Sequence, residues 1–246
     1  MRIALLADLH ANRDAVEACL RKLDKAGHDQ LVLLGDLVGY GPDPAWVVDF
    51  AREAQARGAV VVRGNHDEAV ATSAGERMHA SARFGVDWTR AQLTEAQRGW
   101  LRELPLSVRE EDRLYVHANA HAPAAWGYVN SRLAATHSLA ATDAWLTFCG
   151  HEHAPALYHG QAGQAACFTP QPGFAMPLAP ARRWLAIPGA CGQPRDGNPA
   201  AACALLDTRA RSLTFLRVPY DHDAVAARIL AAGLPAELAR RLAARH

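Results

Sequence analysis

Aspartate, asparagine and histidine side chains gather directly at the ends of five short apolar runs of the chain. Asp8 and His10 follow the first run, and His151 and His153 close the fifth, so the members of each pair are two residues apart. Because side chains two residues apart point the same way in extended backbone, each pair can present two ligands to one centre. The other candidates, at the ends of the three runs between them, are Asp36, Asn65, His66, Asp67 and His117.

The donor types indicate a metal centre. Carboxylates, imidazoles and one amide oxygen, with no thiolate, suit divalent Mn, Fe, Zn, Ni or Co. Seven candidate ligands are too many for one four-coordinate ion, but they suit two ions that share a carboxylate. Such pairs convert bound water to hydroxide near neutral pH and hold phosphoryl oxygens, so the pattern predicts hydrolysis of phosphate esters. The ligand set is Asp8, His10, Asp36, Asn65, His117, His151 and His153.

Short strands and helices must position these side chains. Helices are expected at 12–26, where Asn12 can serve as N-cap, and at 44–57, where Pro44 lies in the first turn. Alternation of strands and helices predicts an α/β fold with a parallel sheet, whose strand carboxyl ends are where ligands bind. The apolar runs typical of strands buried on both faces are 3–7, 30–35, 59–64, 113–117, 146–151, 183–189, 202–207 and 212–218.

The remaining segments complete a single predicted domain over 1–246, because no linker interrupts the chain. Residues 70–105 are expected to form a cap-like helical segment, and 222–246 one or two C-terminal helices. Strands from 155 onward are expected to be antiparallel. The Gly- and Pro-rich segment 160–182 predicts a loop or an irregular hairpin.

Composition excludes several classes of protein. The formal net charge of +1 does not suit a general polyanion binder, so we expect no stable nucleic-acid binding. No window approaches the roughly 20 apolar residues of a membrane span, and the N-terminal apolar run is too short for a signal peptide. The five cysteines are scattered without a C-x-x-C motif, which indicates free thiols in a reducing, cytoplasmic location.

Taken together and in order, these motifs resemble the calcineurin-like metallophosphoesterase superfamily, in particular a subgroup of small bacterial phosphoesterases. The resemblance implies a four-layer αββα sandwich of two mixed β-sheets flanked by helices, with a dinuclear metal site at the strand edge. It places Asp8, His10, Asp36 and His153 on one ion, and Asp36, Asn65, His117 and His151 on the other. Manganese is the favoured metal. The segments that carry the resemblance are ADLHAN (7–12), LLGDLVGYGPDP (33–44), RGNHDE (63–68), YVHAN (115–119), CGHEH (149–153) and PGACGQPRDG (188–197).

The resemblance also implies roles beyond the metals. His66 would contact the phosphate and protonate the leaving oxygen, oriented by Asp67. Asn65 would border the substrate as well as bind an ion. Arg195 is a candidate phosphate contact, with a structural salt bridge as the alternative. Asn12 could cap its helix and also donate to a phosphate oxygen.

The expected substrate is a small phosphodiester or phosphomonoester, with 2′,3′-cyclic nucleotides as the first choice. A phosphoserine/threonine phosphatase or a dinucleoside polyphosphate hydrolase is the runner-up. A nuclease fits the near-neutral charge poorly, and a non-catalytic scaffold has no need of His66. Three departures from the usual family pattern surround the cleft, namely Ala118, Ile187 and Ala190.

Overall fold

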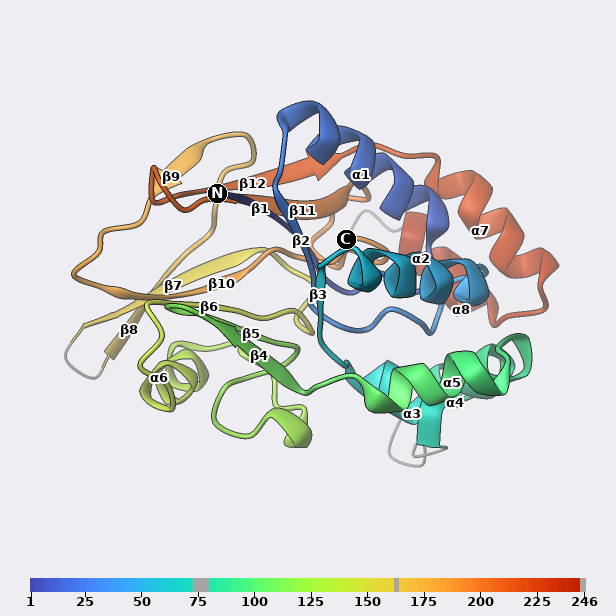
Figure 1. The fold of residues 1–246 in the computed structure, drawn as a ribbon. Coiled ribbons are helices and arrows are strands. Elements are labelled where there is room, and N and C mark those ends of the chain that lie inside the picture. The colour runs from blue at the N-terminus through green and yellow to red at the C-terminus, as the bar shows by residue number, and fades with distance from the viewer. Residues whose placement is uncertain (73–79, 162–163, 244–246) are drawn as a thin grey trace.

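The computed structural model describes residues 1–72, 80–161 and 164–243, and it contains two six-stranded mixed sheets stacked face to face (Figure 1). Strands β1, β2 and β3 pair in parallel, as predicted, and the other pairings of the first sheet are antiparallel. In spatial order the first sheet contains β3 (Val60–Val61), β2 (Gln30–Leu33), β1 (Arg2–Leu6), β11 (Ala201–Asp207), β12 (Ser212–Val218) and β9 (Ala175–Pro177).

The second sheet is also mixed. Its central strands β5, β6 and β10 are parallel, and its outer strands pair in antiparallel fashion. All eight predicted strands therefore exist. In spatial order this sheet contains β4 (Ser107–Glu110), β5 (Arg113–Val116), β6 (Leu146–Phe148), β10 (Arg183–Ile187), β7 (Ala156–Gln161) and β8 (Gln164–Phe168).

The segment 160–182 was predicted as a loop or an irregular hairpin, and the hairpin alternative holds for its first part, because β8 pairs with β7 in antiparallel fashion. The strand β9, also within this segment, was not predicted. Both β8 and β9 are edge strands with many exposed residues, so they lack the apolar pattern that marks buried strands. The strands after 155 are antiparallel except that β10 pairs in parallel with β6.

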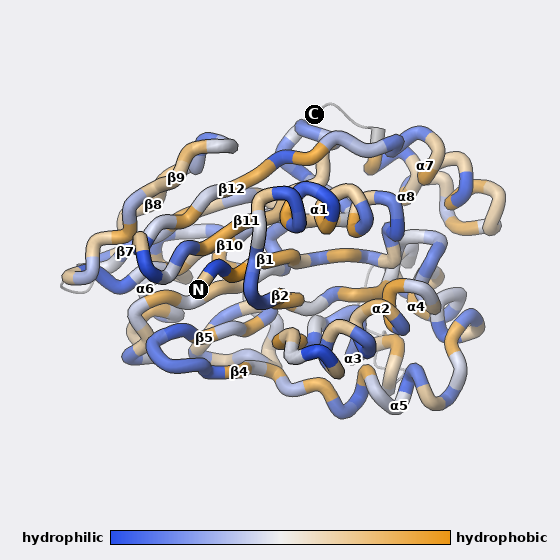
Figure 2. Tube along the Cα trace, turned by 45° about the horizontal axis from the view of Figure 1, so that its top comes forward, coloured by the Kyte–Doolittle hydropathy of each residue, from blue (hydrophilic) through white to orange (hydrophobic). Residues whose placement is uncertain are grey.

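Alternation along the strands separates the layers of the core. In β1, Ile3 and Leu5 point between the sheets, where they share a cluster with Phe148 of the second sheet. The intervening Ala4 and Leu6 belong to the cluster under the helices. In Figure 2 the central strands β1 and β11 are drawn mainly in the hydrophobic colour. Strands buried on both faces thus explain the continuous apolar runs.

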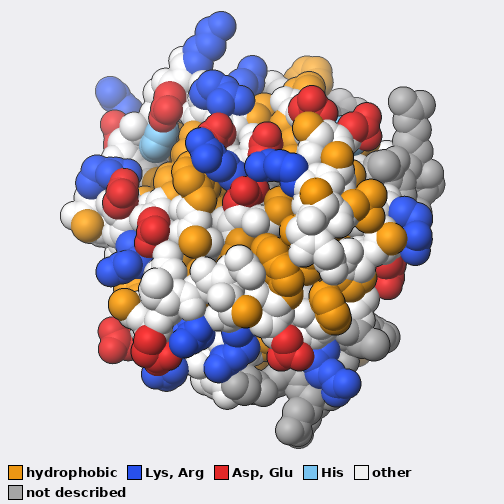
Figure 3. Space-filling view, turned by 90° about the vertical axis from the view of Figure 1, so that its right-hand side faces the viewer, with side chains coloured by type: hydrophobic (Ala, Val, Ile, Leu, Met, Phe, Trp, Pro, Cys, Tyr) orange, Lys and Arg blue, Asp and Glu red, His pale blue; other side chains and the backbone are white. Residues whose placement is uncertain are grey.

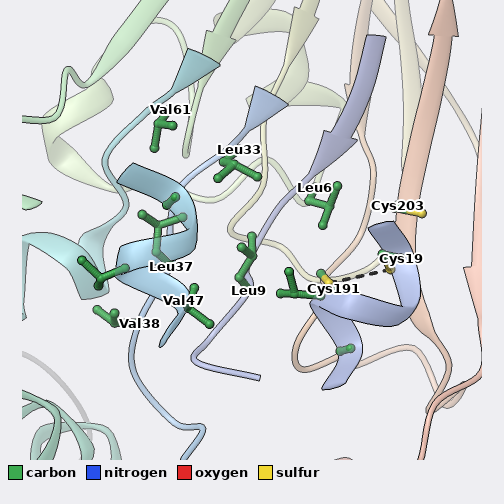
Figure 4. Packing of buried hydrophobic residues seen from close by; sticks show 14 of the residues in the cluster. Leu6, Leu9, Cys19, Leu33, Leu37, Val38, Val47, Val61, Cys191 and Cys203 are labelled. Atoms are coloured by element: carbon green, nitrogen blue, oxygen red, sulfur yellow. Dashed lines mark hydrogen bonds between the residues drawn. The ribbon is translucent and has the colours of Figure 1, made fainter. Parts of the chain in front are cut away.

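Helices cover both outer faces and complete the αββα sandwich. On the first sheet lie α1 (Arg13–Ala26) and α2 (Pro44–Ala56), and on the second lies α6 (Arg132–Ala140). The Asn12 side chain accepts a hydrogen bond from the Ala15 amide at 3.2 Å, which confirms it as the N-cap of α1. Figure 4 shows the cluster under α1 and α2, where the thiols of Cys19 and Cys191 lie 3.8 Å apart.

The remaining helices gather at one end of the sandwich, on the right of Figure 1. Within the predicted cap-like segment 70–105 lie the end of α3 (Asn65–Thr72), α4 (Ala80–Gln92) and α5 (Glu95–Glu103); residues 73–79 of that segment are outside the described part. The predicted C-terminal helices are α7 (His222–Ala231) and α8 (Ala236–Ala243), with 244–246 outside it. Figure 3 shows this end, where hydrophobic side chains lie between basic and acidic ones. Among the described helices, none has the length and apolar character needed to cross a bilayer.

Candidate metal centre

Loops from both sheets converge where five strands end. Backbone hydrogen bonds hold neighbouring loops together, for example from the His10 amide to the Asp36 carbonyl at 2.9 Å. The two sheets are joined directly at this point, because the His151 amide donates to the Asp8 carboxylate at 3.0 Å. The strand ends of β1, β2, β3, β5 and β6 therefore deliver their polar side chains to one buried place.

One group of ligand atoms comes from Asp8, His10 and His153. These atoms all lie within 4.8 Å of one another, and all three residues are buried. The Nε2 atoms of His10 and His153 are 3.2 Å apart, and His153 Nε2 lies 3.5 Å from an Asp8 carboxylate oxygen. Two imidazoles and a carboxylate with this spacing can hold one divalent ion.

A second group comes from Asp36, His117 and His151, with Asn65 beside it. His117 Nε2 lies 3.2 Å from both His151 Nδ1 and Asn65 Oδ1. Asp36 Oδ2 lies 3.4 Å from His117 Nε2 and 3.7 Å from His10 Nε2, so it stands between the two groups. This is the position that a bridging carboxylate would need.

Four backbone carbonyls determine which nitrogen of each histidine faces the centre. A carbonyl oxygen can only accept, so the nitrogen beside it must carry a proton, and the opposite nitrogen is the one that can bind a metal. Such outer contacts orient the ring and fix its tautomer at metal sites. The pairs are His10 Nδ1 with Val38 O at 3.1 Å, His117 Nδ1 with Leu34 O at 2.8 Å, His151 Nε2 with Trp126 O at 3.0 Å and His153 Nδ1 with Gln193 O at 2.7 Å.

Electrostatics favour a cation in this cluster. Burial opposes a charge on Asp36, yet His117, His66 and His10 hold its pKa well below the usual range. Burial also opposes a charge on His117, but the Asp36 carboxylate raises the pKa of His117 to about 9. Burial lowers the pKa of His10 and His153, so these two rings are neutral at pH 7 and face each other with two lone pairs. A bound cation would remove that repulsion, so the donor set fits divalent metals.

Backbone strain is concentrated at the same residues. Asp8, His10, Asp36, His151 and His153 all have φ between 46° and 67°, in the left-handed region that non-glycine residues rarely adopt. Conformations of this kind persist where the surrounding structure holds them, and they cluster at functional sites.

Gly64 allows the third loop to approach Asp36. A Cβ atom added at Gly64 would lie 2.2 Å from both the Asp36 amide nitrogen and Asp36 Oδ1. No side chain can be accommodated at that separation, so only glycine permits this approach.

His66 belongs to neither of these two groups, but one of its ring nitrogens lies within 4.8 Å of ligand atoms of both His10 and Asp36, so the three form a further close group. The His66 ring centroid is 5.0 Å from that of His10 and 4.4 Å from that of Tyr40, and the residue is only 4% exposed. Its Nδ1 has no hydrogen-bond partner among the described residues. Burial lowers the pKa of His66, whereas the Asp36 charge opposes that shift. His66 is thus a buried imidazole with one unpaired nitrogen in the described structure.

The expected partnership of Asp67 with the His66 ring is not what the hydrogen bonds show. Asp67 Oδ1 accepts from the amides of Leu37 and Val38 at 2.9 and 3.2 Å, and Oδ2 accepts from the Gly64 amide at 2.9 Å. The Asp67 carboxylate therefore ties the start of α3 to the loop after β2. Backbone amides satisfy it at closer range than an imidazole on the next residue can.

The two predicted substrate contacts lie in different surroundings. Asn12 is buried, its Oδ1 caps α1, and its Nδ2 donates to the Gly192 carbonyl at 2.8 Å and to the Tyr220 hydroxyl at 3.1 Å. Arg195 is exposed, and its guanidinium donates to Gln193 Oε1 at 3.1 Å. In this arrangement Arg195 can turn toward a ligand, whereas both amide hydrogens of Asn12 have partners within the protein.

Two aromatic residues of the site could not be singled out beforehand. The carbonyl of Trp126 orients His151, and its indole nitrogen donates to Glu68 at 2.9 Å. Tyr128 stacks on the His151 ring with centroids 3.9 Å apart. Asn119 shapes this loop by donating to the Gly127 carbonyl at 2.8 Å. A glycine between two aromatic residues is a turn signal at most, because it does not reveal that a histidine lies opposite.

Comparison with known proteins agrees with this geometry. A crystal structure of a metallophosphoesterase from Sphaerobacter thermophilus is 35% identical, with a TM-score of 0.88 over 100% of this chain and 99% of that one. An uncharacterised protein of Methanocaldococcus jannaschii is 28% identical over 98% of this chain and 96% of its own length. A symmetrical bis(5′-nucleosyl)-tetraphosphatase of Janthinobacterium is 30% identical, but over only 46% of this chain and 42% of its own.

The family model of the calcineurin-like phosphoesterase superfamily domain matches residues 1–211. Its match includes every predicted metal ligand and every strand of the two sheets except β12, which begins at Ser212. The chain therefore belongs to the calcineurin-like phosphoesterase superfamily.

Proposed function

We propose that this protein is a metal-dependent phosphoesterase that hydrolyses small phosphodiesters or phosphomonoesters. One observation carries the proposal. His10 and His153 present unprotonated nitrogens to each other at 3.2 Å, with the Asp36 carboxylate between them and the second histidine pair. A pair of divalent cations accounts for this arrangement, whereas a hydrogen-bonded core does not.

The chain's own residues divide into two sets of metal holders. One ion would be held by Asp8, His10 and His153. The other would be held by His117, His151 and Asn65. Asp36 would bind both ions. When bound, two divalent ions lower the pKa of water and place positive charge against the phosphoryl oxygens. Oxygen and nitrogen donors suit Mn, Fe, Zn, Ni or Co, and we propose Mn²⁺ as the first ion to test.

His66 would act on the ester itself. It lies next to His10 and Asp36, yet its Nδ1 is unpaired in the described structure, so it can donate to a phosphoryl or leaving oxygen. An anionic ester would counteract the burial that lowers the pKa of His66 and thereby keep a proton on the ring. Asp67 contributes indirectly, because it holds the loops on which Asp36 and His66 lie.

Candidate substrates are 2′,3′-cyclic nucleotides and dinucleoside polyphosphates. The second class is supported by the name of the Janthinobacterium relative. The free thiols, of which Cys19, Cys149, Cys191 and Cys203 are buried, support a reducing cytoplasmic location.

The direct test is hydrolysis of bis-p-nitrophenyl phosphate by protein purified with Mn²⁺. We expect turnover that EDTA abolishes and Mn²⁺ restores, with close to two ions per chain by elemental analysis. Protein that contains two ions but shows no turnover on any phosphoester would contradict a catalytic role and favour a scaffold.

A further inference from the structure

A cavity of about 380 Å³ lies directly beside the metal centre. Tyr40 forms one wall, and its ring lies 4.4 Å from that of His66 and 4.6 Å from that of His10. Tyr128 forms another wall and stacks on His151. Because the rings that line the cavity also touch the site residues, a phosphoester held at the metal centre would extend into it.

Two arginines from distant parts of the chain meet at this cavity. Arg195 follows β10, and Arg241 lies on α8, yet the Cζ atom of each is 5.8 Å from the centroid of the Tyr40 ring. Arg241 also pairs with Glu237 one turn earlier on its helix. Burial raises the pKa of Glu152, and the charge of Arg195 opposes that shift, so the Glu152 carboxylate lies within the field of Arg195.

Among the residues that the structure describes, those lining the cavity carry positive charge and include no acid. Neither Glu237 nor Glu152 lines it; in the described part of the chain the lining residues are Tyr40, Ser81, Ala82, Tyr128, Pro194, Arg195 and Arg241. Planar guanidinium groups match phosphate oxygens in pairs of hydrogen bonds, and they carry charge at every relevant pH. The volume is in the range of small-molecule sites.

We propose that this cavity binds a second, non-scissile phosphate group of the substrate through Arg195 and Arg241. The proposal rests on the phosphoesterase function and specifies its substrate class. A 2′,3′-cyclic nucleotide has only the scissile phosphate and would offer neither arginine a phosphate oxygen. A substrate with a phosphoanhydride chain, such as a dinucleoside polyphosphate, places its next phosphate there and its nucleoside against Tyr40 or Tyr128.

Because of the position of Arg241, the proposed phosphate site includes a residue outside the matched family domain. It lies beyond residues 1–211, to which the family model extends, and α8 positions it against the catalytic loops. In the cluster around Tyr40, α8 contributes Leu238 and Leu242. The C-terminal helix therefore forms part of the substrate site as well as packing against it.

The test compares two substrates in one set of variants. For Arg241→Gln we expect the ratio of kcat/KM for diadenosine tetraphosphate to that for bis-p-nitrophenyl phosphate to fall at least tenfold, mainly through KM. Arg240→Gln, on the exposed side of the same helix, is the matched control and should keep the ratio of the unmodified protein. An unchanged ratio in Arg241→Gln, with its melting temperature preserved, overturns the proposal.

A binding measurement separates this inference from the proposed function. EDTA-treated protein is titrated with ADP in a calorimeter, and we expect the Arg195→Gln/Arg241→Gln double variant to bind at least tenfold more weakly. Adenosine serves as the probe without phosphate and should not distinguish the two proteins. Equal ADP binding overturns the cavity assignment even if the enzyme is active. Lack of hydrolysis with retained, arginine-dependent ADP binding contradicts only the proposed phosphoesterase activity.

Discussion

His10 and His153 face each other with Nε2 atoms 3.2 Å apart, although each ring donates its only proton outward to a carbonyl oxygen. The two residues come from different sheets and are separated by 143 positions in the chain. Without a cation between them, this contact is repulsive, so metal binding and stability should be linked.

Removing the metal should therefore destabilise the protein. At a free-ion concentration of about 100 times Kd, binding adds roughly 2.7 kcal/mol, or about 5–11 °C in melting temperature for a chain of this size. Differential scanning calorimetry with Mn²⁺, after EDTA and after readdition of Mn²⁺ measures the difference. Identical melting temperatures in all three samples would count against the metal centre.

Asp36→Asn should affect both ions, since Asp36 lies between the two groups of ligands. The amide has the same shape but no charge, so we expect metal content to fall well below two and turnover to drop at least about 100-fold. Asp24→Asn, on the exposed face of α1, is the control and should retain both. Full metal content in Asp36→Asn would refute a bridging role.

His66→Ala should keep its metals and lose turnover, because His66 lies beside the paired ligands and has an unpaired Nδ1 in the described structure. Loss of a proton donor costs about 10²–10⁴-fold in rate for an ester with a poor leaving group. With p-nitrophenolate, which leaves without a proton, the loss should be much smaller. Equal losses on both esters would rule out proton donation by His66.

Metal binding should release a proton at neutral pH. In the metal-free protein the Asp36 carboxylate raises the pKa of His117 to about 9, so at pH 7 this ring is protonated and must lose the proton before it can bind an ion. Apparent affinity for Mn²⁺ should rise with pH up to about 9 and level off above it. Calorimetric titrations in buffers of different ionisation enthalpy count the released protons; none released at pH 7 would contradict the expectation.

Two glycine substitutions should act in opposite directions. Gly64→Ala places a methyl group 2.2 Å from the Asp36 backbone, which should cost about 3 kcal/mol or more and reduce metal content. Gly99→Ala lies within α5, where an added Cβ meets no atom within 4 Å, so it should stabilise the protein by about 0.5–1 kcal/mol. Urea unfolding of both variants measures the free energies. A neutral Gly64→Ala would mean that the two loops are not held at the described distance.

The candidate ligands and most of the fold could be predicted from the sequence alone. Strands buried on both faces require continuous apolar runs, so all eight predicted runs form strands, and the polar residues at the ends of five of them fall on one edge. The exposed edge strand β9 was not predicted, and β8 only as part of an irregular hairpin, because edge strands need no such apolar pattern. The N-cap at Asn12 could be predicted from the sequence, since a cap depends on residues only three positions apart.

Only the tertiary structure decided which groups meet. The carbonyls of Val38, Leu34, Trp126 and Gln193 orient the four histidines, and a carbonyl has the same chemistry whatever side chain its residue carries. Asp67 turned out to hold backbone amides instead of the His66 ring. Arg241 reaches Tyr40 across 201 positions of sequence, through the packing of α8. Such contacts depend on how whole elements pack in space, and no local spacing in the chain records them.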